Sequence, residues 1–434
     1  MIPLEEKLTK IMSWEIKSKK LEQADKTKAS INEHFYILER ETMQGRPNTY
    51  TAKKIKGKIY RLNEKIYSIK PENNFDSLVK RDIESQLKAQ EAYLDYWYNP
   101  QPKITTVEEY LEKIWGKGSF DLINKELENY DYEFNDTRAM VLNKIHTNSF
   151  ESNEQDIRKQ IEEHLPFLKK MVLDYGRKKQ FLSKKVDFDL VLADPSCDYS
   201  SWDSAVLRMA IDADRIRVYK KGKETEIYEG DADITAFHEF GGHNLRQYFS
   251  KDMPPGLRAT ATNLSSLVSP VVDEGVAMFI EKYGFRYMKR NKKSLVLNDK
   301  DIKGAEMFLK FFYQEKLFRL AHAVYEKKEA ESNKFDAHEE LSKRAKNPVF
   351  ERDKFLIEDE SLLERQDNLN YFVGREHVKG IMAELKKRYY SKVIEKNETI
   401  ILRGLLTGNW SWETHKDFFF SEYMKKVDKH RCLK

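Results

Sequence analysis

The segment HEFGGH at residues 238–243 places a strong constraint on the local fold. His238 and His243 are five residues apart. Residues four apart project about 40° apart on an ideal α-helix, whereas residues five apart project about 140° apart. The two histidines can therefore share one ion only if a π-type turn absorbs the extra residue. Gly241 and Gly242 lie between them and accept unusual dihedral angles. We predict a non-α turn within residues 238–243.

A second segment supplies the third ligand that such a site needs. A catalytic zinc site commonly has three protein ligands, often histidine and carboxylate, and one open position. The sequence SPVVDEGVAMFIEKYG at residues 269–284 has apolar residues on helical faces and contains Glu274. Asp273 precedes this glutamate and either binds the metal instead or orients a ligand histidine. Gly275 follows it and removes bulk beside the predicted ligand.

Glu239 is the predicted general base. It directly follows the first histidine and projects about 100° from it on a helix. From this position the carboxylate can take a proton from a water molecule at the metal and pass it to a leaving amine. The pattern predicts a zinc metallopeptidase with Zn²⁺ bound by His238, His243 and Glu274. In the alternative without a metal, neighbouring groups form hydrogen bonds with the two helix histidines, and Glu274 forms a salt bridge.

These motifs resemble gluzincin-type zinc metallopeptidases of the HExxxH variety. HEFGGHNLR and DEGVA are similar to the segments HExxTH-x-LR and EEGLA of the tubulin tyrosine carboxypeptidase family, with Gly242 in place of the threonine. GGHNLRQ and DEGVAMFIEKYG resemble HEAxPGHHLQ and EGWALYAE of a largely bacterial peptidase family, with one residue fewer between the histidines. The resemblance covers residues 233–284. It implies a zincin-like fold, bound Zn²⁺, and a peptide or protein substrate.

A shorter resemblance concerns the segment NYFVGREHVKGI at residues 370–381. The bacterial family has a Tyr-x-x-Gly-basic helix start late in the chain, which Tyr371, Gly374 and Arg375 match. By this resemblance Tyr371 hydrogen-bonds the oxyanion and Arg375 binds a substrate carboxylate. Both families suggest a carboxypeptidase, in agreement with that role for Arg375. The alternative is a helix with a buried tyrosine and a surface arginine.

Outside these motifs the chain has mostly helical patterns. It has only 17 Gly and 11 Pro in 434 residues, which favours long helices and few loops. Apolar residues have helical spacing at 78–98, and Thr106 with Glu109 resembles a capping box before the next helix. Alternation predicts a strand at 186–190 and a hairpin at 214–230. We expect a mainly α, zincin-like fold with a small antiparallel β-sheet packed beside the motif helix.

Three regions are expected: a helical N-terminal region at 1–180, a catalytic α/β core at 181–290, and a helical C-terminal region at 291–434 that completes the cleft.

The net charge of +5, from 77 basic and 72 acidic residues, is nearly balanced and gives no indication of nucleic-acid binding. No apolar run approaches the roughly 20 residues of a membrane helix, and no apolar signal segment is recognised. Cys197 and Cys432 suggest no disulfide framework. A cytoplasmic protein is therefore expected.

Two other function classes stay open. One is a non-catalytic helical binding protein with a vestigial or structural metal site. The other is a zinc amidohydrolase that acts on a non-peptide amide. Glu239 counts against the first, because a decayed site has no need of a base. His322 lies on an apolar helix face and is more typical of a core histidine than of a catalytic one.

Overall fold

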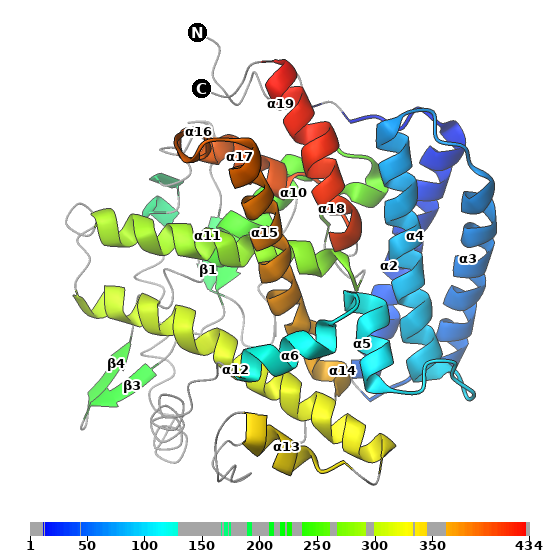
Figure 1. The fold of residues 1–434 in the computed structure, drawn as a ribbon, viewed down its shortest axis with the longest axis horizontal. Helices are drawn as coiled ribbons and strands as arrows, with labels where there is room; N and C mark the ends of the chain where they lie inside the picture. Colours follow the sequence, from blue (N-terminus) through cyan, green and yellow to red (C-terminus); the bar gives the residue numbers. More distant parts are fainter. Residues whose placement is uncertain are drawn as a thin grey trace.

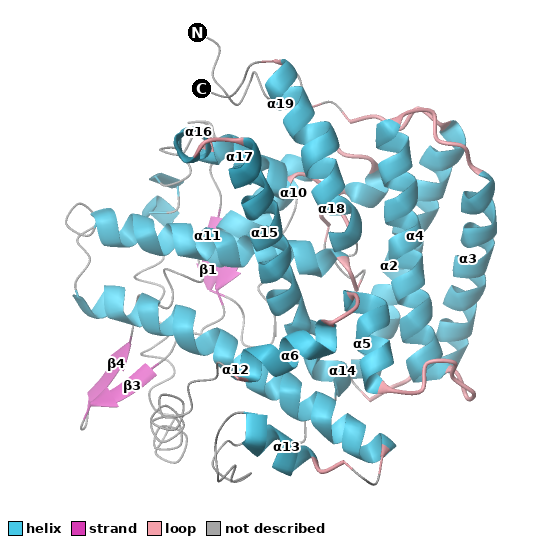
Figure 2. Cartoon of the chain, viewed as in Figure 1, coloured by secondary structure: helices cyan, strands magenta, loops and turns pink. Residues whose placement is uncertain are grey.

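In the computed structural model, helices dominate the described part of the chain and strands are short (Figure 1; Figure 2). The mainly helical character expected from the scarcity of glycine and proline is confirmed. The structure describes residues 12, 14–43, 45–128, 166, 169–171, 173–174, 189–192, 208–211, 218–221, 224–227, 237–260, 267–291, 299–332, 335–344 and 362–430.

The helices with described bounds fall into three groups. The first comprises α2 (Lys19–Met43), α3 (Thr49–Ser68), α4 (Asn74–Tyr98), α5 (Val107–Trp115) and α6 (Ser119–Leu127). The second comprises η2 (Phe237–Asn244), α10 (Leu245–Ser250), η3 (Pro255–Leu257), α11 (Ser269–Asn291) and α12 (Asp299–Glu331). The third comprises α13 (Ala337–Arg344), α14 (Leu362–Arg365), η6 (Gln366–Asn368), α15 (Leu369–Arg388), α16 (Ser391–Lys396), α17 (Glu398–Leu406), α18 (Trp412–Phe418), η7 (Phe419–Met424) and α19 (Lys425–Lys429).

Local signals set the ends of the N-terminal helices. The helix predicted at 78–98 is α4, and the side chain of Asn73 caps it by accepting a hydrogen bond from the Asp76 amide. Thr106 caps α5, as predicted, because its hydroxyl accepts a hydrogen bond from the Glu109 amide at 3.3 Å. Such side chains satisfy backbone donors that have no partner within the first helical turn.

One hydrophobic core joins the two ends of the chain. Trp14 stacks on Phe75 of α4 with ring centroids 5.5 Å apart, and it meets Phe418 of α18 at 5.0 Å. The buried Trp410 stacks on the same Phe418 at 4.6 Å. In Figure 1, α18 accordingly lies next to α4, and α15 runs across α11 in the middle of the molecule. The candidate site lies where α11, α15 and η2 meet.

The strands correct the expected fold class. β1 (Asp189–Leu192) and β2 (Arg208–Ile211) form a parallel pair, whereas β3 (Val218–Lys221) and β4 (Glu224–Ile227) form the antiparallel hairpin predicted at 214–230. The two pairs are separate two-stranded ladders, and the parallel one contacts η2. The prediction of a zincin-like fold with one small antiparallel sheet beside the motif helix is therefore wrong.

The physical reason is that alternation predicts a strand but not its partner. Residues 193–207 separate β1 from β2, and a connection of a dozen or more residues is long enough for two strands to pair in parallel. The first part of the strand predicted at 186–190 lies outside the described residues, as do Cys197 and Cys432. Within the described part of the chain, no helix combines the length and the apolar character needed to cross a bilayer.

Candidate metal centre

The histidine motif forms the π-helix η2, which continues directly into α10. The predicted non-α turn is therefore confirmed. Because the wider turn absorbs the extra residue, the rings of His238 and His243 lie on the same side of the helix, with centroids 4.9 Å apart. Their Nε2 atoms are 3.2 Å apart. The five-residue spacing is thus compatible with one shared ion.

The glycines of these motifs also allow close helix packing, which the sequence interpretation did not consider. A Cβ at Gly242 would lie 2.3 Å from the Cβ of Ala277, so η2 rests directly on α11. A Cβ at Gly275 would lie 2.3 Å from the carbonyl oxygen of Gly374 on α15. Such distances are too short for any side chain. Gly275 therefore serves the crossing of α11 and α15, in addition to leaving room beside Glu274.

Glu274 completes a cluster with the two histidines. Its Oε2 lies 3.2 Å from Nε2 of His238, and its Oε1 lies 3.9 Å from Nε2 of His243. All three residues offer ligand atoms within 4.8 Å of one another, so this group could hold a metal ion. Two ligand atoms that are each about 2.0–2.1 Å from one ion lie about 3.4 Å apart at a tetrahedral angle. The observed separations are close to that value.

The hydrogen-bonding state of Glu274 agrees with a cation in this position. Its Oε2 atom is buried and lies 3.2 Å from Nε2 of His238, close enough to accept a hydrogen bond when that nitrogen carries a proton. A buried carboxylate oxygen is costly unless a proton donor or a cation compensates its desolvation. A cation among the three ligand atoms would remove that cost.

Glu281 and Tyr313 orient His238 from behind. Nδ1 of His238 lies 2.5 Å from Oε1 of Glu281, and the hydroxyl of Tyr313 donates to both oxygens of that carboxylate at 2.6 and 2.5 Å. Because an ionised carboxylate only accepts, it places the proton on Nδ1 and leaves Nε2 for the cluster. Sequence reasoning missed Glu281. Its spacing of seven residues from Glu274, two helical turns, was the available signal.

Asp273 and Arg246 do the same for His243. Nδ1 of His243 lies 2.7 Å from Oδ2 of Asp273, whose Oδ1 accepts a hydrogen bond from Nη1 of Arg246 at 3.2 Å. Arg246 is fully buried and also donates through Nε and Nη2 to the carbonyl of Gly408. Of the two roles left open for Asp273, the geometry favours orienting a histidine, while Glu274 faces the cluster.

The carboxylates make this centre strongly attractive to positive charge. Burial lowers the pKa of His243, but Asp273 and Glu274 outweigh it and raise that pKa to about 9. Burial likewise lowers the pKa of His238, but Glu281 and Glu274 raise it well above its usual value. Burial raises the pKa of Asp273, but His243 and Arg246 lower it to about 2. The same negative charge that holds protons on the imidazoles would stabilise a bound cation.

The predicted base and the predicted oxyanion donor both lie at this centre. Glu239 is buried in η2, and its charge contributes to the raised pKa of His243. The ring of Tyr371 stacks on His238, with centroids 6.3 Å apart and an angle of 28° between the planes. Lys316 of α12, which sequence reasoning missed, places its ammonium 4.3 Å from the centroid of the Tyr371 ring.

Arg375 is not brought into the cluster. Its Nη2 lies 2.6 Å from Oε1 of Glu126 on α6, and its guanidinium lies over the ring of Phe372, 5.7 Å from the centroid. This geometry gives no support to its expected role in binding a substrate carboxylate. His322 also lies apart from the cluster, with Nε2 3.4 Å from the Glu326 carboxylate one turn along α12.

Two further histidines, the buried His415 and the half-buried His377, form a pair that joins α15 to α18. Nε2 of His377 lies 3.0 Å from Nδ1 of His415, and Nε2 of His415 lies 3.1 Å from the carbonyl oxygen of Leu405. Burial and the nearby charges of Lys416 and Arg246 lower the pKa of His377 to about 4. Burial and His377 lower the pKa of His415 well below its usual value.

The histidine pair predicts acid sensitivity of the fold. Between pH 6.5 and pH 4 the unfolded chain binds a proton at His377 that the folded chain does not bind, so the free energy of unfolding falls as the pH falls through this window. The full effect is roughly 3 kcal/mol for a shift of this size. Denaturant unfolding at pH 7 and at pH 5 measures the change in the free energy of unfolding between these pH values. We expect His377→Gln to make this change smaller. The exposed His430→Gln should keep it, and an unchanged difference in His377→Gln would refute the assignment.

Neither a scan against protein-family models nor a search of curated proteins found a match for this chain. The resemblance of residues 233–284 to HExxxH gluzincins therefore stays a prediction.

Proposed function

We propose that this protein is a zinc-dependent metallopeptidase that binds Zn²⁺ through His238, His243 and Glu274. The observation that carries the proposal is the convergence of three ligand atoms within 4.8 Å of one another, with the two histidine Nε2 atoms 3.2 Å apart and Oε2 of Glu274 3.2 Å from Nε2 of His238. Two imidazoles and one carboxylate are a donor set typical of catalytic zinc. Magnesium and calcium prefer sites composed of oxygen atoms, so they fit these ligands less well.

The surrounding residues suit hydrolysis of an amide bond. A divalent ion held by His238, His243 and Glu274 would supply Lewis acidity toward a carbonyl oxygen and a water molecule. Glu239 takes the proton from the water and gives it to the leaving amine. The Tyr371 hydroxyl donates a hydrogen bond to the oxygen that becomes negative, and Lys316 adds positive charge beside the tyrosine ring.

Carboxypeptidase activity is the narrower form of the proposal. It rests on the resemblance, and for Arg375 to bind a terminal carboxylate the contact with Glu126 would have to open. A zinc amidohydrolase with a non-peptide substrate would use the same cluster and the same base. The substrate therefore has to be identified by experiment.

Metal content and chelation test the proposal. We expect about one zinc ion per chain in the purified protein, and its loss on chelation should abolish peptide hydrolysis while the helical circular dichroism signal stays. Glu274→Gln should bind zinc more weakly than Glu326→Gln, a control on α12.

Cleavage is followed by mass spectrometry on peptides with a free C-terminus and on their amides. Hydrolysis of the free acids alone would support a carboxypeptidase, equal hydrolysis would contradict it, and hydrolysis that persists without metal would overturn the zinc proposal.

A further inference from the structure

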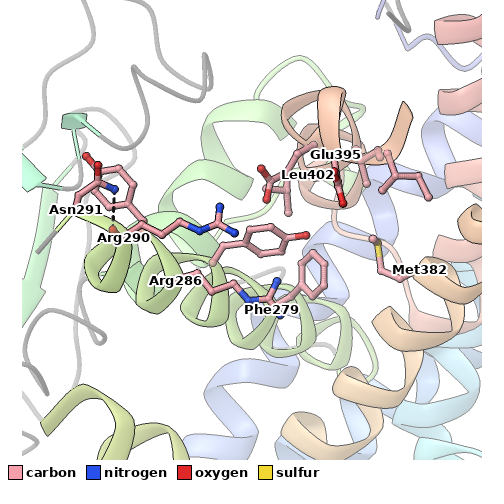
Figure 3. A pocket seen from close by; sticks show the side chains of 12 residues that line it. Phe279, Arg286, Arg290, Asn291, Met382, Glu395 and Leu402 are labelled. Carbon is pink, nitrogen blue, oxygen red and sulfur yellow. Dashed lines mark hydrogen bonds between the residues drawn. The ribbon is translucent and has the colours of Figure 1, made fainter. Parts of the chain in front are cut away.

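A cavity lies on the other side of α11 from the candidate metal cluster. This cavity of about 510 Å³ lies between the C-terminal half of α11 and the helices α15, α16 and α17 (Figure 3). Small-molecule sites typically have volumes of about 300–1,000 Å³. Phe279, Tyr283 and Tyr287 of α11 form an aromatic wall, and Met382 and Leu402 add apolar surface from α15 and α17. The cavity thus has the size and the lining of a ligand site.

Helix geometry separates this cavity from the metal cluster. Glu274 and Glu281 are seven residues apart and lie on one face of α11, toward η2. Phe279 and Tyr283 follow Glu274 by five and nine residues, which places them about 140° and about 180° around the helix. The aromatic wall therefore faces away from the metal ligands, and a molecule in the cavity occupies a different site from a molecule bound at the metal.

Charges of opposite sign line opposite sides of the cavity. Arg286 and Arg290 extend from α11, and Glu395 of α16 lies across from them (Figure 3). Glu398 at the start of α17 belongs to the same acidic side. The guanidinium of Arg286 lies over the ring of Tyr283, 5.7 Å from the centroid. A ligand that spans the cavity would thus meet cations at one end and carboxylates at the other.

We propose that this cavity binds a zwitterionic dipeptide with apolar side chains. Its carboxylate would lie against Arg286 and Arg290, which can bind a carboxylate through paired hydrogen bonds. Its ammonium group would lie against Glu395 and Glu398, and its side chains would pack on the aromatic wall. The cavity has more room than a single amino acid fills. The proposal rests on the lining of the cavity and does not depend on the peptidase assignment.

The phenol of Tyr283 is a further polar group for such a ligand. Burial and the charge of Glu398 raise its pKa to about 12, with Arg286 acting in the opposite direction. The hydroxyl is therefore protonated at neutral pH and can donate a hydrogen bond to a peptide oxygen. Its ring meets Phe279 edge to face, with centroids 4.8 Å apart, which holds the aromatic wall in place.

Calorimetric titration with leucyl-phenylalanine tests the proposal. The titration uses full-length protein carrying Glu239→Gln, so that the probe is not hydrolysed. We expect one dipeptide to bind per chain, and its amide and its N-acetyl form to bind about ten-fold or more weakly, since each loses one charge-assisted contact. Arg290→Gln should remove the preference for the free acid, and Glu395→Gln the preference for the free amine. Lys289→Gln is the matched control, because this exposed neighbour of Arg290 does not line the cavity.

Chelation separates this site from the proposed metal centre. Binding that persists in metal-depleted protein supports the cavity, whereas binding that disappears with the metal places the dipeptide at the metal centre and overturns the second site. Absence of binding at millimolar dipeptide, or equal affinity for all three forms, also overturns it. A protein that binds the dipeptide but no zinc would refute the proposed function and leave this inference standing.

Discussion

Replacement of Glu239 by glutamine is expected to lower kcat for peptide hydrolysis by about 10²–10⁴-fold, the usual contribution of a general base. The amide has nearly the size of the carboxylate but cannot take a proton from water. Because the three predicted ligands are unchanged, the variant should keep its full metal content. The measurements are kcat on a peptide found to be cleaved and metal content by elemental mass spectrometry.

Glu281→Gln provides the contrasting variant. Glu281 holds Nδ1 of His238 and is not one of the three predicted metal ligands. Its loss should weaken metal affinity by about 10–100-fold, as is usual for groups that orient metal ligands. Saturating zinc should then restore much of the activity of Glu281→Gln but none of that of Glu239→Gln. If Glu239→Gln turns over peptide at the wild-type rate, Glu239 is not the base.

Replacement of Gly374 by alanine is expected to destabilise the fold by about 1–3 kcal/mol or more, because it overpacks a closed helix crossing. A Cβ at this position would lie 2.1 Å from the carbonyl oxygen of Val271 and 2.8 Å from the amide nitrogen of Gly275. Both contacts are with backbone atoms, so α15 and α11 must move apart. Glu274 lies on α11 and would move with that helix, and Tyr371 lies on α15 and would move with the other. Metal affinity should therefore fall together with stability.

Gly380 offers a matched control on the same helix. A Cβ at Gly380 would have no neighbour within 4 Å, and alanine in a helix interior is favoured over glycine by about 0.5–1 kcal/mol. Gly380→Ala should therefore raise the free energy of unfolding, whereas Gly374→Ala lowers it. Denaturant unfolding and zinc titration of the two variants check the expectation. Equal stabilities would show that the crossing of α11 and α15 tolerates a methyl group.

Much of the candidate site was predictable because neighbouring residues on a helix have fixed relative directions. The spacing of His238 and His243 is incompatible with a regular α-helix around one ion, and the structure has a π-helix at that place. Glu274 was predicted as the third member and lies within reach of both histidines. Tyr371 was predicted by resemblance and stacks on His238. The inferences about His238, His243 and Glu274 needed only local geometry and the chemistry of zinc ligands, whereas the one about Tyr371 needed the resemblance.

The partners of these residues depend on segments far apart in the sequence. Tyr313 reaches Glu281 from α12, and Lys316 of the same helix lies over Tyr371. Arg375 pairs with Glu126, which is about 250 positions away in the chain, and no local pattern indicates that contact. Such contacts depend on how the helices cross, and the crossings depend on the shape of the whole core.

The sequence by itself determined the helical elements, the hairpin at 214–230 and the three members of the cluster that could hold a metal ion, because these depend on period, caps and spacing within short segments. Only the tertiary structure decided that β1 and β2 pair in parallel, that Gly275 and Gly374 let α11 and α15 touch, and that Arg375 lies against α6. The physical reason is that periodicity specifies which face of an element is apolar, whereas close packing in the core selects the element that covers that face.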